Sequence, residues 1–148
     1  VESMRLLIGE KSKLISKIES TPGLSNLETI LEVTDAILID RGDLSRQVPI
    51  EKIPFLQRKI ISVAKYHQVP VYVATNLLES MILMNQPTRA EVNDVISTIF
   101  MGADGLVLAA ETAIGGFPVE TVVMVNKLLG EYKKWTPNTN ISEIVEKW

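Results

Sequence analysis

The chain has 148 residues, enough for one ordinary domain with its own core, and its 46% hydrophobic and 22% charged content is typical of a folded globular protein. With 15 Lys and Arg against 18 Asp and Glu the net charge is −3, so neither nucleic acid nor an anionic membrane is expected as a partner, and no apolar run approaches the roughly 18 residues that cross a bilayer. The absence of cysteine excludes a disulfide framework, a thiol nucleophile and a thiolate metal site, and it is compatible with the cytoplasmic location that we expect.

Four apolar runs of strand length recur along the chain. They are Leu14–Ile18, Ala36–Ile39, Val69–Ala74 and Gly105–Ala109. Three of the four runs are nearly continuous in apolar residues, as in parallel strands that are covered on both faces. The last three begin about 34 residues apart, which is the length of a βα repeat. The pattern predicts four parallel strands joined by helices.

The predicted helices between these strands are indicated by their ends and by their apolar stripes. Ser25–Glu28 and Thr88–Glu91 both fit a capping box, in which the first side chain accepts from the third helical N–H and the Glu reaches back. Apolar residues spaced by three and four over residues 53–63 predict a helix with one buried stripe. Those at 119–129 predict another helix, which begins after Pro118.

Shorter helices are predicted at the two ends of the chain. Met4–Ile8 has the pattern of the end of a preceding helix, and Thr136–Asn138 interrupts the chain before a short terminal helix, Ile141–Trp148. We therefore divide the chain into four βα units over residues 1–135 and a C-terminal extension over residues 136–148.

The order of elements, a helix followed by four βα units, predicts an α/β fold with a parallel sheet and right-handed crossovers. Four such units are half of a TIM (β/α)8 barrel, but they could also form an open doubly wound sheet. A nucleotide-binding open sheet usually carries a glycine-rich phosphate loop after its first strand. Here that position is Ser20–Gly23, which has one glycine. Half of a TIM barrel is therefore the favoured prediction.

Charged residues gather where two of the predicted strands end. Lys17-Ile18-Glu19 closes the first strand and Arg41-Gly42-Asp43 follows the second. Alternation along a strand turns Lys17 and Glu19 to the same side. In parallel α/β folds this rim is where ligands bind. An ammonium group, two carboxylates and a glycine-containing turn suit a hard divalent metal and an anionic, oxygen-rich substrate.

At these residues the chain resembles the pyruvate kinase family. Five ordered motifs carry the resemblance: Ser16–Glu19, Arg41–Leu44, Ala74–Met81, Pro87–Glu91 and Glu111–Ala113. The corresponding part of that family is the second half of its (β/α)8 catalytic barrel. The resemblance implies that residues 1–135 form a pyruvate kinase-like half-barrel.

The resemblance also implies roles for individual residues. Lys17 is expected to stabilise charge at the transferring phosphoryl group and the enolate, and Thr75 to lie near the carbon that is protonated; both are catalytic candidates. Glu19 and Asp43 are expected to bind the divalent metal, Mg²⁺ or Mn²⁺. Glu111, after the last strand, is expected to contact and support the residues that hold the ligands.

Substrate binding is assigned to the turn after the second strand and to Thr75. Asp40, Arg41 and Gly42 correspond to the turn whose backbone amides meet the substrate carboxylate. Several positions depart from the family pattern, and Asp40 stands where the family usually has alanine. It adds a negative charge beside an anionic substrate, so we expect the departures to affect efficiency and substrate preference more than fold.

The implied reaction is the glycolytic transfer of a phosphoryl group from phosphoenolpyruvate to ADP, giving pyruvate and ATP. Mg²⁺ or Mn²⁺ is the implied cofactor, and K⁺ is possible in the full-length enzyme. The remaining half of the barrel is an expected partner, and so is a second copy in a homo-oligomer. Because the first barrel half also supplies substrate-binding residues in the family, we expect the chain to be inactive on its own.

Two alternative functions stay open at this point. A metal-dependent aldolase or lyase acting on a pyruvate enolate would use the same carboxylates, and it would differ in not binding nucleotide. A non-catalytic half-barrel could serve as an assembly module, because its open strand edges invite pairing. Asp35 and Asp104 precede strands at the opposite, stability face of the barrel, so neither is assigned a catalytic role.

Overall fold

The computed structural model describes residues 1–9, 11–136 and 138–145. Its centre is a single parallel sheet of β1 (Ile15–Ile18), β2 (Ala36–Asp40), β3 (Val71–Ala74) and β4 (Gly105–Val107), in that order. All four predicted strands are present, parallel and adjacent in sequence order, which confirms the predicted α/β topology. The last strand ends two residues before the predicted Ala109.

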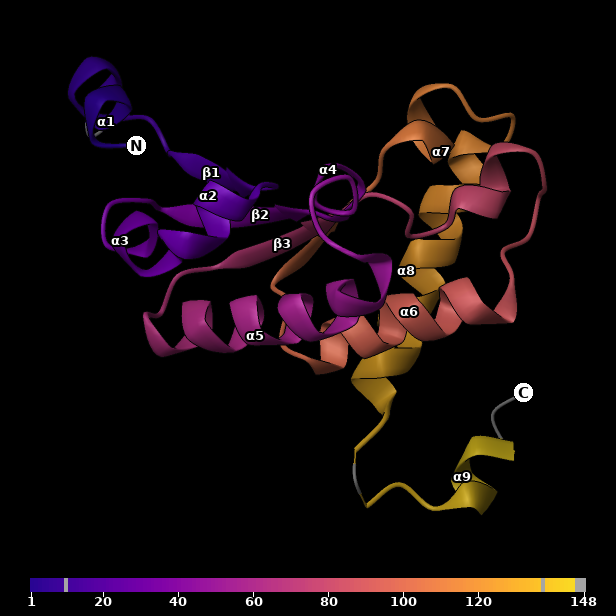
Figure 1. Ribbon diagram of the computed structural model, residues 1–148. Helices are drawn as coiled ribbons and strands as arrows, with labels where there is room; N and C mark the ends of the chain where they lie inside the picture. Colours follow the sequence, from indigo (N-terminus) through magenta and orange to yellow (C-terminus); the bar gives the residue numbers. More distant parts are fainter. Residues whose placement is uncertain (10, 137, 146–148) are drawn as a thin grey trace.

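A helix or a helix pair follows every strand (Figure 1). The helices are α1 (Glu2–Ile8), α2 (Thr21–Ser25), α3 (Leu27–Leu31), α4 (Arg41–Leu44), α5 (Ile53–Tyr66), α6 (Arg89–Phe100), α7 (Ala110–Ala113), α8 (Pro118–Lys134) and α9 (Ile141–Val145). Within the described ranges there are also two 3₁₀ turns, η1 (Ile50–Lys52) and η2 (Glu79–Ile82). These four βα units are those of half a (β/α)8 barrel.

The structure describes only the first part of the predicted C-terminal helix. Helix α9 begins at the predicted Ile141, and residues 146–148 of the predicted helix lie outside the described residues. The division of the chain at residue 135 stays a prediction. Among the described residues, no helix combines the length and the apolar character needed to cross a membrane.

One face of the sheet is sealed by helices. Its alternate residues are fully buried in a cluster with α3 and α5: Ile18, Ile37, Ile39, Val71 and Val73. Figure 1 shows α5 lying along this face. A second cluster joins η2 to α6 and α8. The first cluster includes Leu56, Ile60 and Val63 of the predicted stripe on α5. On α8 the predicted helix forms, but Val119, Val122 and Val123 are exposed, and the helix packs through Met124, Val125, Leu128 and Leu129. Burial of the two clusters is the main favourable contribution to stability.

The opposite face of the sheet is less covered at its edges. Ile15 on β1 is 51% exposed and Val107 on β4 is 37% exposed. Register places Lys17 on this face, opposite Leu38 of β2. In a closed barrel this is the inward face, so the chemistry and the uncovered apolar residues share one side of the sheet.

Two aspartates stabilise the N-terminal edge of the sheet with the same kind of hydrogen bond. Asp35, just before β2, accepts a hydrogen bond from the Leu14 backbone N–H at 2.6 Å. Asp104, just before β4, accepts from the Val71 backbone N–H at 2.8 Å. Each carboxylate therefore ties the start of its own strand to the strand before it, a structural role at the edge opposite the candidate site.

One of the two predicted capping boxes forms. Thr88 accepts from the Glu91 backbone N–H, and Glu91 bonds back to Thr88. The prediction for Ser25–Glu28 is wrong, because a short helix begins earlier, after Ser20, whose hydroxyl accepts from the Gly23 N–H. Ser25 is the last residue of that helix, and its hydroxyl donates to the Thr21 carbonyl.

Candidate functional site

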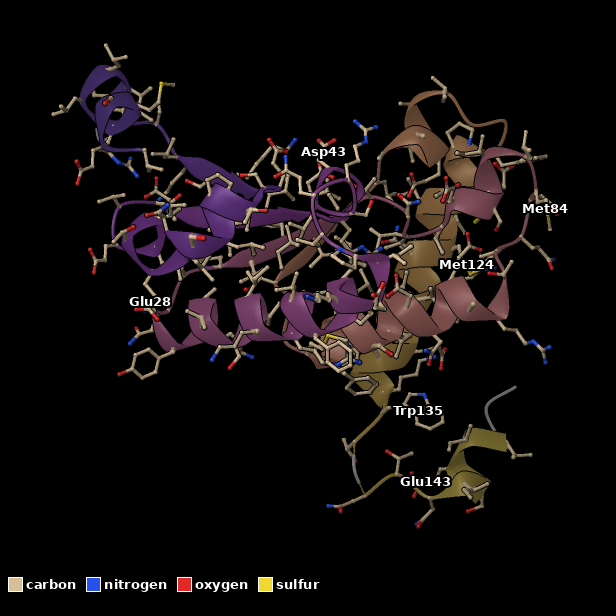
Figure 2. The ribbon with its side chains drawn as sticks, viewed as in Figure 1. Glu28, Asp43, Met84, Met124, Trp135 and Glu143 are labelled. Atoms are coloured by element: carbon tan, nitrogen blue, oxygen red, sulfur yellow. The ribbon has the colours of Figure 1, made fainter. Side chains whose placement is uncertain are left out.

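The candidate site lies at the C-terminal edge of the sheet. Lys17 is the second-last residue of β1, Asp40 ends β2, and Thr75 directly follows β3. Asp43 projects from α4, which begins immediately after β2 (Figure 2). Because parallel strands bring their carboxyl ends to one edge, residues distant in sequence meet there.

Lys17 sits among three carboxylates. Its Nζ lies 2.6 Å from Glu19 Oε2, 3.0 Å from Asp40 Oδ2 and 3.9 Å from Asp43 Oδ2. Hydrogen bonds with the carboxylates of Glu19 and then Asp40 raise the pKa of Lys17 well above its usual value. The lysine is therefore held as a cation, the form that stabilises developing negative charge.

Glu19, Asp40 and Asp43 each offer a carboxylate oxygen, and these oxygens lie within 4.8 Å of one another. Apart from Lys17, the cluster is met by Arg46, whose exposed guanidinium lies 3.3 Å from Asp43 Oδ1. Negative charge therefore exceeds positive charge at the cluster. Hard oxygen ligands with surplus negative charge fit a divalent cation such as Mg²⁺ or Mn²⁺. The expectation that Glu19 and Asp43 approach each other agrees with this geometry.

Asp40 connects the charged cluster to the next strand. Its Oδ1 accepts from the Thr75 hydroxyl at 2.6 Å and from the Asp43 backbone N–H at 3.4 Å, so it also caps α4. Burial tends to raise the pKa of Asp40, but the bonds from Thr75, from Lys17 and from the Asp43 N–H outweigh it and lower that pKa. Asp40 is thus an anion that links both predicted catalytic residues.

The side chain of Arg41 points elsewhere. Its Nη1 lies 2.6 Å from Asp94 Oδ2 on α6, and it donates to Gln57 of α5 at 3.4 Å. Its other nitrogens donate to the Thr75 and Asn76 carbonyls. Sequence reasoning did not find Asp94 or Gln57. The one signal in the sequence was Gln57, a polar residue at stripe spacing from Ile53 and Ile60, and the structure buries it.

Gly42 and Glu111 occupy different surroundings. A Cβ added at Gly42 would lie 2.7 Å from the Thr75 Cγ2, so the bare Cα of Gly42 lies against the threonine. Glu111 on α7 is 2% exposed, and its Oε2 accepts from the Ala109 N–H at 3.0 Å. Its Oε1 has no hydrogen-bond partner among the described residues. None of the contacts found for Glu111 within the described ranges reaches the carboxylate cluster, so its supporting role stays a prediction.

Comparison with protein-family models matches residues 1–122 to the pyruvate kinase barrel domain. The chain belongs to the pyruvate kinase family. Among curated relatives, the pyruvate kinase of Thermotoga maritima is 48% identical over 126 residues, which are 85% of this chain and 27% of that protein. A pyruvate kinase of Agrobacterium vitis is 39% identical over 142 residues, 96% of this chain and 30% of its own length.

A solved structure supports the same assignment. The chain is similar to a pyruvate kinase from Cryptosporidium parvum with a TM-score of 0.81 and 39% sequence identity, over 84% of this chain and 25% of that one. This chain therefore spans between a quarter and a third of the pyruvate kinases that it matches. The resemblance first seen in short motifs is confirmed at the level of the family, and the half-barrel agrees with its barrel domain.

Proposed function

We propose that the chain is the part of a pyruvate kinase catalytic domain that carries the catalytic lysine and the metal ligands, and that the whole protein transfers a phosphoryl group from phosphoenolpyruvate to ADP. One observation carries the proposal above the others. Lys17 meets Glu19, Asp40 and Asp43 at the carboxyl edge of a parallel sheet. In barrel enzymes that edge is the catalytic face.

In this proposal Glu19 and Asp43 hold Mg²⁺ or Mn²⁺, with Asp40 beside them. The cation, when bound, neutralises negative charge on the substrate oxygens. Lys17 binds the phosphoryl oxygens and the enolate oxygen as a cation, and hydrogen bonds to Glu19 and Asp40 raise its pKa. Phosphoryl transfer depends mostly on positioning and on neutralising spread-out charge, which these groups supply.

The remaining proposed roles belong to the turn after β2 and to the residue after β3. The backbone amides around Arg41 and Gly42 open α4, and there they would meet the substrate carboxylate. The Thr75 hydroxyl donates a hydrogen bond to Asp40. That hydroxyl lies at the rim, where it would stand close to the carbon that takes up a proton.

The proposed activity needs more chain than these residues. In the comparisons the chain covers 25–30% of whole pyruvate kinases. The half-exposed Ile15 and Val107 mark the two open edges where the other barrel half would pair. ADP, K⁺ and a homo-oligomeric partner belong to the whole protein in this proposal, as does a place in glycolysis.

A chimera tests the proposal directly. The segment of the Thermotoga maritima pyruvate kinase that aligns with this chain over 126 residues is replaced by this chain's residues. The chimera should form pyruvate from phosphoenolpyruvate with ADP and Mg²⁺, and the same chimera with Lys17→Ala should not. A folded chimera without turnover, or turnover that survives the lysine substitution, would contradict the proposal. An aldolase or lyase would instead consume its substrate without ADP.

The open edges favour one second candidate, an assembly module without its own chemistry. It would predict self-association of the 148-residue chain through β1 and β4. Size-exclusion chromatography compares the chain with a variant in which the exposed Ile15 and Val107 are both replaced by lysine. Loss of association in that variant, together with an inactive chimera, would favour this function.

A further inference from the structure

Two consecutive residues after β3 adopt a left-handed backbone. Thr75 has φ 76° and Asn76 has φ 56°. Asparagine tolerates this region, but a β-branched threonine seldom enters it, because its Cβ substituents crowd the backbone. Such a conformation is energetically unfavourable and persists only where the surroundings hold it. The residues around this turn must therefore make the interactions that stabilise its conformation.

Arg41 donates three hydrogen bonds to the turn. Its Nε and Nη2 donate to the Thr75 carbonyl at 3.1 and 2.7 Å, and Nη2 also donates to the Asn76 carbonyl at 3.0 Å. Both left-handed residues are therefore bound through their carbonyl oxygens by one rigid group. The planar fork of a guanidinium suits this pattern, whereas an ammonium would act as a single point.

The guanidinium is itself fixed from the opposite side. Nη1 pairs with Asp94 at 2.6 Å and donates to Gln57 at 3.4 Å, and the arginine side chain is only 11% exposed. Gln57 is held in turn by a 3.0 Å bond to the Thr98 hydroxyl. Helices α5 and α6 thus aim Arg41 at the turn, and charge assistance from Asp94 strengthens the attachment.

The two neighbours of Arg41 in sequence contact the same threonine. Asp40 accepts the Thr75 hydroxyl at 2.6 Å, and the Cα of Gly42 lies against the Thr75 methyl group. Three consecutive residues therefore bind the carbonyl, the hydroxyl and the methyl group of one residue. This arrangement fixes both the backbone and the χ1 angle of Thr75.

We propose that the side chain of Arg41 has a positioning role. It holds the left-handed turn at Thr75 and Asn76 and so aims the Thr75 hydroxyl at Asp40, and this side chain, unlike the Arg41 backbone amide, does not bind substrate. The conformation of the turn follows from hydrogen bonds within the chain. That the aimed hydroxyl serves phosphoryl transfer rests on the function proposed above, so the test reads the conformation of the turn without any substrate.

The experiment uses the 148-residue chain and nuclear magnetic resonance. Backbone carbon shifts and three-bond HN–Hα couplings of Thr75 and Asn76 report whether φ is positive. Arg41→Ala should remove the left-handed signature at both residues, while the signals of the core around β2 and β3 stay in place. Arg58→Ala is the matched control, since Arg58 is exposed and its one described hydrogen bond goes to Pro54 of its own helix.

Two further variants keep the test decisive. Arg41→Lys retains the charge opposite Asp94 but lacks the fork, so it should lose part of the left-handed signature. Asp94→Asn should weaken the signature less than Arg41→Ala does, because the carbonyl bonds remain. If Arg41→Ala fails to fold, the lysine variant decides. An unchanged signature at Thr75 and Asn76 in the folded arginine variants would overturn the proposal, even if the chimera is active.

Discussion

Gly42 and Gly23 offer a paired test of how tightly Thr75 is held. Both lie in the first turns of short helices, Gly42 in α4 and Gly23 in α2. In a helix, alanine is usually more stable than glycine by roughly 0.5–1 kcal/mol. A Cβ at Gly23 would meet only Ser20 Oγ at 3.4 Å, an ordinary contact. Gly23→Ala should therefore stabilise the chain.

The same substitution at Gly42 meets an obstacle. Its Cβ would lie 2.7 Å from Thr75 Cγ2, closer than such atoms approach. Thr75 cannot turn away freely, because its hydroxyl is bonded to Asp40 and its carbonyl to Arg41. Overpacking of this kind costs about 1–3 kcal/mol, and rotating the hydroxyl off a carboxylate costs a similar amount. Gly42→Ala should therefore destabilise the chain once the helical gain is included.

The measured quantity is the difference between the two variants. Urea unfolding followed by circular dichroism should place Gly42→Ala about 1–3 kcal/mol below Gly23→Ala in free energy of unfolding, which is the overpacking cost alone. The comparison cancels the helix propensity of alanine. If both variants gain the same stability, Thr75 is free to move, and the account of a fixed threonine is refuted.

Four other outcomes follow from the site and its surroundings. In the chimera, Lys17→Ala should lower kcat strongly and alter the KM for phosphoenolpyruvate less, because its charge matters most in the transition state; an effect on KM alone would contradict this. The 148-residue chain by itself should give no pyruvate in a coupled assay with Mg²⁺ and K⁺. Positioning of the reactants lowers an activation barrier by roughly 7–11 kcal/mol, and half a site loses much of that contribution. Clear turnover by the chain alone would contradict this prediction. Glu19→Gln should weaken Mn²⁺ binding to the chain, as measured by electron paramagnetic resonance, whereas Glu143→Gln on α9 should not. Equal Mn²⁺ affinities of the two variants would show that Glu19 is not a metal ligand. Burial tends to raise the pKa of Glu91, but hydrogen bonds from Ser80 and Thr88 outweigh it and lower that pKa below the usual 4.5. The carboxylate should therefore add stability above about pH 4.5 that is lost as the pH falls through the folded pKa. The difference in unfolding free energy between the wild type and Glu91→Gln should shrink over that range, and a difference independent of pH would disprove the assignment.

Much of the fold could be predicted because its signals are local and repeated. Apolar runs at βα spacing predict parallel strands, and the structure has all four in sequence order. Alternation predicts that Lys17 and Glu19 share a side, and their charged atoms are 2.6 Å apart. Both predictions depend only on strand geometry, which tertiary context changes little.

The features that could not be predicted depend on contacts between distant residues or run against the local conformational propensity of the residue. Arg41 pairs with Asp94, 53 residues further along the chain, and no spacing rule connects them. Thr75 has the β-branched side chain of a strand residue, and its propensity predicts extended backbone, not φ 76°. Ser25 fits a capping box by pattern, but the competing cap at Ser20 starts the helix earlier. In each case tertiary packing or a neighbouring element decided between local options.

Asp40 shows how a partly buried negative charge can be accommodated at the candidate site. The sequence resemblance predicts that Asp40 adds a negative charge where the family usually has alanine, beside the expected position of an anionic substrate. In the structure its oxygens meet the Lys17 ammonium, the Thr75 hydroxyl and the Asp43 N–H. These donors stabilise the carboxylate enough to keep its pKa low despite burial. In the proposed function a substrate phosphoryl group would compete with Asp40 for Lys17, and the carboxylates would hold a divalent cation that offsets their negative charge.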